Sequence, residues 1–284
     1  MSWQMLLSIS ILSYSLAILT QRILMKGNKS DPVSYSVIFQ LLTGFIIGIF
    51  GYLTADMTIP RVQPLLINLT LLTLLYGIGN IFTFKALKML EASEFTIIFA
   101  TRGLFTLIAS SILLKEGLYS TQFLGALLIL ISVVLVTIKS MHLKFSRGEL
   151  LALLGAMCMG FAVTNDRYLL SYFSVYPYVT IAFILPALFI GLLNFKKMKN
   201  VKTLFKKHIF IKMLVMCLLF SISSISFFSA LKMGNNSSQI AILNLLSIIL
   251  IVVLGTVFLR ERNNILRKII GSILSIIGSA ILVK

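Results

Sequence analysis

The chain has 284 residues, of which 58% are hydrophobic and only 12% are charged, and its mean hydropathy is +1.03. These values exclude an ordinary water-soluble protein, because the surface of a soluble chain of this length needs many more Lys, Glu and Asp residues. The formal net charge of +17 does not indicate nucleic-acid binding, since the basic residues lie beside apolar segments and lack the aromatic context of RNA-binding motifs. The composition therefore predicts an integral membrane protein in contact with the lipid bilayer.

Ten apolar segments are long enough to cross a bilayer, which takes about 20 residues per helix. The first five are Trp3–Gln21, Val33–Leu53, Leu65–Phe84, Ser93–Leu114 and Leu118–Ile138. The second five are Gly148–Leu170, Tyr178–Phe195, Ile209–Ser229, Ser237–Leu259 and Ile265–Val283. Helix breakers and capping residues fall between the segments. The sequence thus predicts an all-α integral membrane protein of ten transmembrane helices, the first of them retained rather than removed as a signal peptide.

Residues with catalytic or metal-binding chemistry are scarce. Cys158 and Cys217 lie inside predicted helices, and His142 and His208 lie in predicted loops. They make neither a disulfide framework nor the ligand spacing of a zinc site. The sequence also lacks a Gly-rich phosphate loop, a hydrolase nucleophile motif and a metalloprotease motif. We therefore expect no catalytic residues, no metal and no cofactor, and a function other than that of an enzyme.

Lys and Arg are distributed unevenly between the two sides of the predicted bundle. The loops after the first, third, fifth, seventh and ninth segments hold 19 of the 25 basic residues, led by the run Lys196–His208. The positive-inside rule places that side in the cytoplasm. The charge count therefore predicts that both termini lie outside the cytoplasm.

Similar short sequences recur in the two halves of the chain. FKALKM at Phe84–Met89 returns as FSALKM at Phe228–Met233, and Arg22 near the end of the first segment corresponds to Arg167 near the end of the sixth. Because five is an odd number, a second copy of a five-helix unit enters the membrane from the opposite side. Inverted repeats of this kind are typical of secondary transporters, whose halves rock around a site near the middle of the membrane. The predicted repeats are residues 1–140 and 146–284.

The ends of the fourth and ninth segments correspond as well. LLKE at Leu113–Glu116 matches FLRE at Phe258–Glu261, and the following segments carry Gly125 and Gly271. With the layout of five plus five helices, this pattern resembles the EamA-like family of the drug/metabolite transporter superfamily over nearly the whole chain. The resemblance implies a central cavity lined by the first, third, fourth, sixth, eighth and ninth helices. It also implies export of amino acids or other small metabolites in many members, and usually cytoplasmic termini, in conflict with the charge count.

Two details bear on local structure. Members of that family often have Pro near the middle of the fourth and ninth helices, where this sequence has Gly103 and Ile248, so the sequence does not predict the local opening that a proline provides. Glu116 and Glu261 are expected to cap the fifth and tenth helices or to steady the turns before them.

Arg102, in the run IFATRGLF, is the least expected residue of the predicted helices. It lies nine residues into the fourth segment, which corresponds to about 13 Å and brings it close to the midplane. Arg at this depth costs about 2.5 to 3.5 kcal/mol and should face the protein interior or a watery cavity. One interpretation is a structural ion pair, for instance with Asp166. The other, which we prefer, is an anion clamp that holds a carboxylate or phosphate through two parallel hydrogen bonds.

Further polar side chains in the predicted helices complete the candidate site. Tyr76 and Asn80 are four residues apart and share a helix face, and Asp166 is the candidate for proton coupling. For each substrate-binding candidate taken singly, an interhelical hydrogen bond is the simpler interpretation. Besides Arg102, the substrate-binding candidates are Tyr14, Tyr76, Asn80, Thr101, Asn165, Ser224 and Asn244.

The leading hypothesis is a secondary transporter, an exporter of a small polar metabolite such as an amino acid or organic anion, that works by alternating access in a bacterial inner or plasma membrane. A flippase for a lipid-linked polar head group is the alternative within the same fold. A non-transporting membrane scaffold or sensor is the alternative from another class. The sequence leaves open the substrate, the coupling to a proton or counter-substrate, and the formation of a homodimer.

Overall fold

The computed structural model describes residues 2–26, 31–114, 120–137, 146–195, 204–233, 244, 246–261 and 263–282. Every regular element in these ranges is helical, which confirms the predicted all-α class. The helices are α1 (Trp3–Met25), α2 (Pro32–Thr54), the short 3-10 helix η1 (Gln63–Leu65), α3 (Leu66–Met89), α4 (Ala92–Phe99), α5 (Arg102–Leu114), α6 (Ser120–Thr137), α7 (Arg147–Leu170), α8 (Val175–Leu193), α9 (Lys207–Met233), α11 (Leu246–Phe258) and α12 (Ile265–Leu282).

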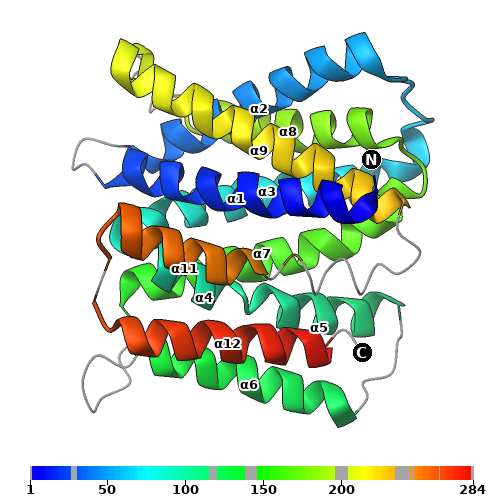
Figure 1. Ribbon diagram of the computed structural model, residues 1–284. Coiled ribbons are helices and arrows are strands. Elements are labelled where there is room, and N and C mark those ends of the chain that lie inside the picture. Colours follow the sequence, from blue (N-terminus) through cyan, green and yellow to red (C-terminus); the bar gives the residue numbers. More distant parts are fainter. Residues whose placement is uncertain are drawn as a thin grey trace.

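The helices lie side by side as one bundle, and α1 begins at the same end of the bundle at which α12 ends (Figure 1). Among the described residues, two shorter apolar stretches, Leu124–Leu135 in α6 and Leu246–Phe258, accompany the longer ones. Within the part of the chain that the structure describes, six stretches are long and apolar enough to cross a membrane: Trp3–Met25, Pro32–Thr54, Gln63–Met89, Arg147–Leu170, Val175–Leu193 and Lys207–Ala230. The bundle is therefore that of a multi-pass membrane protein.

Local signals at the helix starts agree with the sequence. The Ser2 side chain accepts a hydrogen bond from the Met5 N–H at the start of α1, and Asp31 caps α2 ahead of Pro32. At α7, Ser146 and Glu149 form a reciprocal capping box. Each cap satisfies backbone N–H groups that have no partner inside the helix, so these polar residues fix where the apolar helices begin.

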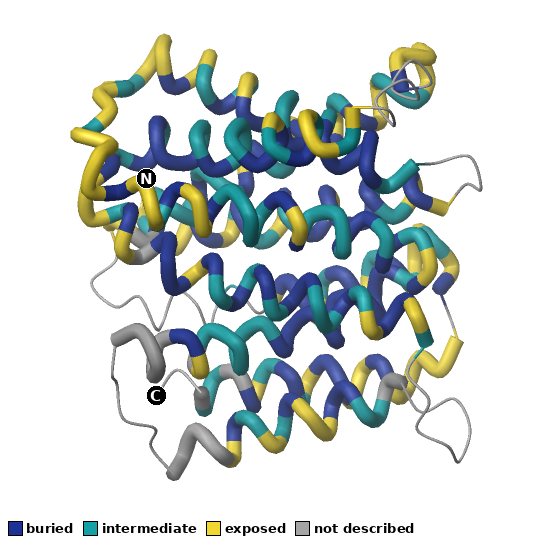
Figure 2. Tube along the Cα trace, turned by 180° about the vertical axis from the view of Figure 1, so that it is seen from behind, coloured by how far each residue is buried: buried dark blue, intermediate teal, exposed yellow. Residues whose placement is uncertain are grey.

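Helices from the two halves of the sequence pack against each other in pairs: α1 on α9, α3 on α7, α2 on α8 and α6 on α12. Phe39 of α2 is central to the largest core cluster. Its ring centroid lies 5.5 Å from that of Phe84 and 4.7 Å from that of Phe220. Exposed positions gather on the outer faces and ends of the helices (Figure 2). Many of these exposed residues are large and apolar, so the outer surface of the bundle is apolar.

The predicted fourth helix is not continuous. The structure divides Ser93–Leu114 into α4 and α5 at a turn formed by Ala100 and Thr101. Here the backbone bonds change to the shorter i to i−3 type, with Thr101 N donating to Ile98 O at 3.1 Å and Gly103 N donating to Ala100 O at 3.1 Å. The Thr101 hydroxyl also donates to Ile98 O, at 2.8 Å, and so competes with the regular helix ladder. The α-helical hydrogen-bond ladder is thus interrupted here without a proline.

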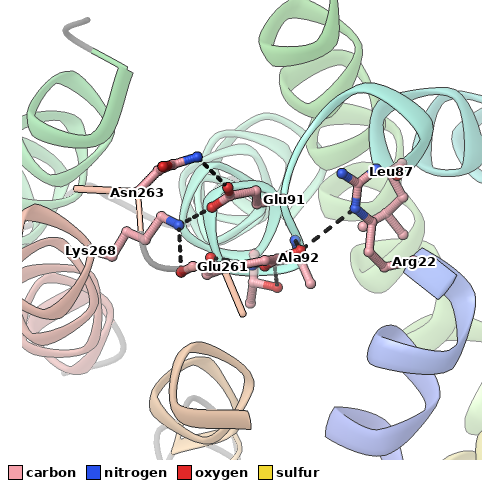
Figure 3. Close-up of polar contacts among 9 residues, drawn as sticks. Arg22, Leu87, Glu91, Ala92, Glu261, Asn263 and Lys268 are labelled. Atoms are coloured by element: carbon pink, nitrogen blue, oxygen red, sulfur yellow. Dashed lines mark hydrogen bonds and ion pairs between the residues drawn. The ribbon is translucent and has the colours of Figure 1, made fainter. Parts of the chain in front are cut away.

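Glu261 does not cap the helix that follows it, although its backbone bonds Gly255 O and the Lys268 side chain, in line with the alternative expectation that it steadies the turn. Its carboxylate accepts hydrogen bonds from the backbone N–H groups of Ala92 and Ser93, so it caps α4 of the first half and not the helix that follows it (Figure 3). Asn264 precedes α12 instead, and its carbonyl accepts from Lys268 N. The corresponding expectation for Glu116 lies outside the described residues.

Candidate functional site

Arg102 is the first residue of α5, directly after the break in the fourth helix. Its guanidinium carbon lies 5.4 Å from the centroid of the Phe99 ring. Within the described part of the chain, this guanidinium forms no ion pair and no side-chain hydrogen bond. The N–H groups of Gly103 and Leu104 are already bonded to Ala100 O and Thr101 O, so what the start of α5 offers an anion is the positive end of the helix dipole. Arg102 is therefore a partly buried cation at the start of a helix. Among the described residues it has no anionic partner.

Asp166, near the end of α7, is buried at 4% exposure. One carboxylate oxygen accepts from the Tyr76 hydroxyl at 2.6 Å, and the other accepts from the Tyr178 hydroxyl at 2.5 Å. The ion pair between Arg102 and Asp166, one of the two interpretations that the sequence allowed, is not formed. Neutral hydroxyls from α3 and α8 occupy the carboxylate instead, and the Arg167 side chain lies outside the described residues.

Asn165, the neighbour of Asp166, is committed to α3. Its side-chain oxygen accepts from the Asn68 amide at 2.7 Å, and its side-chain nitrogen donates to the Asn68 carbonyl at 2.8 Å. These bonds bridge α3 and α7. Asn165 is therefore an interhelical contact in this conformation, and the simpler interpretation of this candidate agrees with the geometry.

The start of α5 rests directly on α7. The Thr106 hydroxyl donates to Gly160 O at 3.1 Å, and a Cβ atom on Gly160 would lie 2.6 Å from Arg102 O. Gly160 and Asp166 are six residues apart on α7, which corresponds to about 9 Å along the helix. The Tyr76 hydroxyl of α3 in turn bonds Asp166. Arg102, Tyr76 and Asp166 therefore belong to one region of the bundle.

The other predicted residues are spread more widely. Thr101 is buried and bonded to its own helix, and the Tyr14 ring lies edge-on to Phe220, with centroids 5.9 Å apart. Asn80 on α3, Ser224 on α9 and Asn244 are helical and half-buried. The structure thus bonds Tyr76 to Asp166 and packs the start of α5, with Arg102, against α7, the helix that carries Asp166, whereas among the described residues no side-chain hydrogen bond or ion pair joins these other candidates to them.

Sequence reasoning missed two partners of the site, Asn68 and Tyr178. Each is a polar side chain within an apolar segment, and this feature could have indicated an interhelical hydrogen bond. Tyr178 stood at the predicted start of the seventh helix, where an interfacial position was the ordinary expectation. Its contact with Asp166 depends on how α8 packs against α7, which spacing along one helix does not specify.

Comparison with known proteins decides the family. The model of the EamA-like transporter family matches residues 1–138 and 146–284. The chain belongs to the EamA-like transporter family. A solved crystal structure has a similar fold, with a TM-score of 0.63 and 16% identity over 96% of each chain, and a search of curated proteins returns no significant match. The EamA-like assignment makes the protein a membrane transporter, in agreement with its apolar helices.

Proposed function

We propose that this EamA-like protein is a secondary transporter, working as an exporter, for a small polar metabolite that carries a carboxylate or phosphate, with Arg102 as the anion contact. The observation that carries the proposal is the guanidinium at the start of α5, partly buried and without a hydrogen-bonded or ion-paired partner among the described residues. An unpaired Arg between apolar helices is costly. A planar anion that binds it through two parallel hydrogen bonds would offset that cost.

Asp166 is the proposed coupling group. Its partners among the described residues are the neutral hydroxyls of Tyr76 and Tyr178, so its charge is not balanced by an adjacent cation there. A proton or a positively charged group on the substrate would neutralise it. Rotation of either tyrosine hydroxyl away from the carboxylate would expose it to such a partner. The remaining proposed substrate contacts are Tyr14, Asn80, Thr101, Asn165, Ser224 and Asn244.

Alternating access by two inverted repeats, residues 1–140 and 146–284, is the proposed mechanism, and paired contacts support it. Ser10 of α1 meets Ser223 of α9, with the Ser10 hydroxyl 2.9 Å from Ser223 O. The repeat spacing of FKALKM and FSALKM maps Ser223 onto Gly79, and the spacing of Arg22 and Arg167 maps Ser10 onto Gly155. A Cβ on Gly155 would lie 3.6 Å from Gly79 O, in the contact of α3 with α7. Corresponding positions thus meet in both helix pairs, α1 with α9 and α3 with α7.

A binding experiment with Arg102 variants tests the proposal. Purified protein is screened for thermal stabilisation by carboxylates and phosphates, and the best ligand is titrated against Arg102→Ala and Arg102→Lys. We expect Ala to weaken binding by about 2 to 5 kcal/mol and Lys to recover part of the loss, because Lys keeps the charge without the planar geometry. Both variants should stay close to the melting temperature of the unliganded protein, since the guanidinium has no hydrogen-bonded or ion-paired partner among the described residues and Ala loses only its contact with the Phe99 ring there.

Arg61→Ala is the matched control, because Arg61 is an exposed residue of the loop before η1. It should bind like the unaltered protein. Flux of the same ligand from proteoliposomes should fall in parallel with binding in the Arg102 variants. Equal binding by Arg102→Ala and the unaltered protein would exclude the anion clamp, and lipid scrambling without metabolite binding would favour the flippase.

A further inference from the structure

One end of the bundle holds a second polar cluster, where the end of α1 and the junction of α3 with α4 meet the turn between α11 and α12 (Figure 3). We call Arg22, Glu91, Glu261, Asn263 and Lys268 the clasp. The described side chains of Glu261 and Lys268 are nearly fully buried, at 6% and 4% exposure. Charged residues rarely become this buried without partners, and each of them has partners from the opposite half of the chain.

Glu261 of the second half binds the first half. Its carboxylate accepts from Ala92 N at 3.1 Å and from Ser93 N at 3.4 Å, and it also accepts from the Ser93 hydroxyl at 3.3 Å. Arg22 Nε lies 3.6 Å from the same carboxylate, while Arg22 donates to Leu87 O at 2.6 Å. A carboxylate at a helix N-terminus is favoured by the free N–H groups and by the dipole, so Glu261 holds α4 and α1 together.

Glu91 of the first half binds the second half in return. It stands at the N-cap position of α4 but makes no side-chain bond to that helix. Its carboxylate instead forms an ion pair with Lys268 of α12 and accepts from the Asn263 amide at 3.0 Å. The two glutamates are therefore exchanged: each half supplies a carboxylate to the other.

The backbone conformation of the turn between α11 and α12 positions the Glu261 carboxylate. Arg260 and Asn264 have positive φ values of 55° and 52°, a conformation that costs a residue other than glycine about 1 kcal/mol or more. Glu261 N donates to Gly255 O at 3.2 Å, and a Cβ on Gly255 would lie 3.1 Å from Glu261 Oε2. A larger residue at position 255 would therefore displace the carboxylate that caps α4.

We propose that the clasp is a closed gate, which must break for this end of the bundle to open. The inference rests on the proposed function, in which the two halves move relative to each other. Separating α1, α3 and α4 from α11 and α12 at this end removes the cap of α4, the contact between Arg22 and Glu261 and the ion pair between Glu91 and Lys268 in one step. Three charge-assisted contacts that fail together make the end either closed or open, with few intermediate arrangements.

A distance measurement tests the gate in the full-length protein without any substrate. Both native cysteines are changed to Ala, and spin labels are placed at Met89→Cys on α3 and Leu266→Cys on α12, which are 52% and 69% exposed. The protein is reconstituted in lipid nanodiscs. Electron–electron resonance then gives the distribution of distances across the clasp, and a pair at Phe258→Cys and Leu266→Cys, both in the second half, serves as reference.

Neutralising the clasp should open it. We expect Glu91→Gln, Glu261→Gln and Lys268→Met each to increase the ratio of a longer to a shorter population across the clasp about tenfold, the effect of losing one charge-assisted bond. Lys268→Arg should stay close to the unaltered protein because it keeps the charge. Asp56→Asn is the matched control, since this exposed carboxylate is bonded within its own loop to Thr58.

The variants also separate gating from folding. Glu91→Gln leaves the cap of α4 intact and should fold even if Glu261→Gln does not. An unchanged distance distribution in folded Glu91→Gln and Lys268→Met would overturn the proposal, as would a change of the reference pair by the same amount. A result that overturns the gate proposal says nothing about ligand binding at Arg102. The gate and the anion contact can therefore be refuted independently.

Discussion

Asp166 shows how a single side chain can be specified by three helices. Its carboxylate lies on α7, and its two donors, Tyr76 and Tyr178, lie on α3 and α8. Hydroxyl donors bond a carboxylate without adding a second charge, which leaves its negative charge available to a proton or cation. The rings provide apolar surface toward the neighbouring helices, and the Tyr178 ring packs edge-on against Phe228, with centroids 5.8 Å apart. The two tyrosines thus provide both the hydrogen-bond donors for Asp166 and the apolar packing around it.

Removing the Tyr178 hydroxyl should therefore destabilise the fold measurably. We expect Tyr178→Phe to lower the free energy of unfolding by about 1 to 2 kcal/mol, because one oxygen of a buried carboxylate loses its donor. In an Asp166→Asn background the same change should cost less, since a neutral acceptor is bonded more weakly. Titration with a denaturing detergent measures both. Tyr172→Phe is the control, because among the described residues that exposed hydroxyl bonds Tyr168, at 3.4 Å. Equal losses at Tyr172 and Tyr178 would contradict the assignment.

At the scale of the helix, close approach depends on small residues. Gly160 of α7 faces the start of α5, and an added Cβ would lie 2.5 Å from Phe105 Cβ and 2.6 Å from Arg102 O. Both neighbours are backbone or directly attached to it, so they cannot move without shifting α5. The contact therefore fixes the position of the helix that carries Arg102.

Substitution of this glycine should affect stability and ligand binding together. Gly160→Ala should cost about 1 to 3 kcal/mol through overpacking and should weaken the ligand identified with Arg102. Gly191→Ala is the matched control, because its Cβ would meet Val37 Cγ1 at 3.5 Å, an ordinary contact. It should be neutral or slightly stabilising, since Ala is the better helix former. Thermal unfolding with and without ligand checks both, and a neutral Gly160→Ala would show that α5 is free to shift.

Much of this architecture was accessible from the sequence. Hydropathy located the helices because a bilayer admits only long apolar stretches, and Arg102 was found because a charge is conspicuous among apolar residues. The break at Thr101 was not predicted, since a threonine that bonds its own helix has the same sequence signature as one that bonds a neighbour. The cap of α4 by Glu261 was missed for a different reason. Spacing along the chain indicates local caps, whereas this partner comes from the other half.

The whole molecule makes a prediction about orientation. With both ends of the chain on one side, a phosphatase fused after Lys284 should be active outside the cytoplasm, and a fluorescent protein at the same place should stay dark. The reason is the excess of Lys and Arg in the loops at the clasp end, which the positive-inside rule places in the cytoplasm. A fluorescent fusion and an inactive phosphatase would restore the usual family orientation and put the clasp on the outer side.

The exchange of glutamates also has a consequence for the order of assembly. Ala92 is separated from Glu261 by 169 positions, so the ribosome has completed most of the chain before the cap of α4 exists. Until then the first N–H groups of α4 have no partner from Glu261, and Glu91 has no Lys268. The helices of the first half can therefore enter the membrane before α4 has its cap, and the later hairpin of α11 and α12 completes a helix made in the first half.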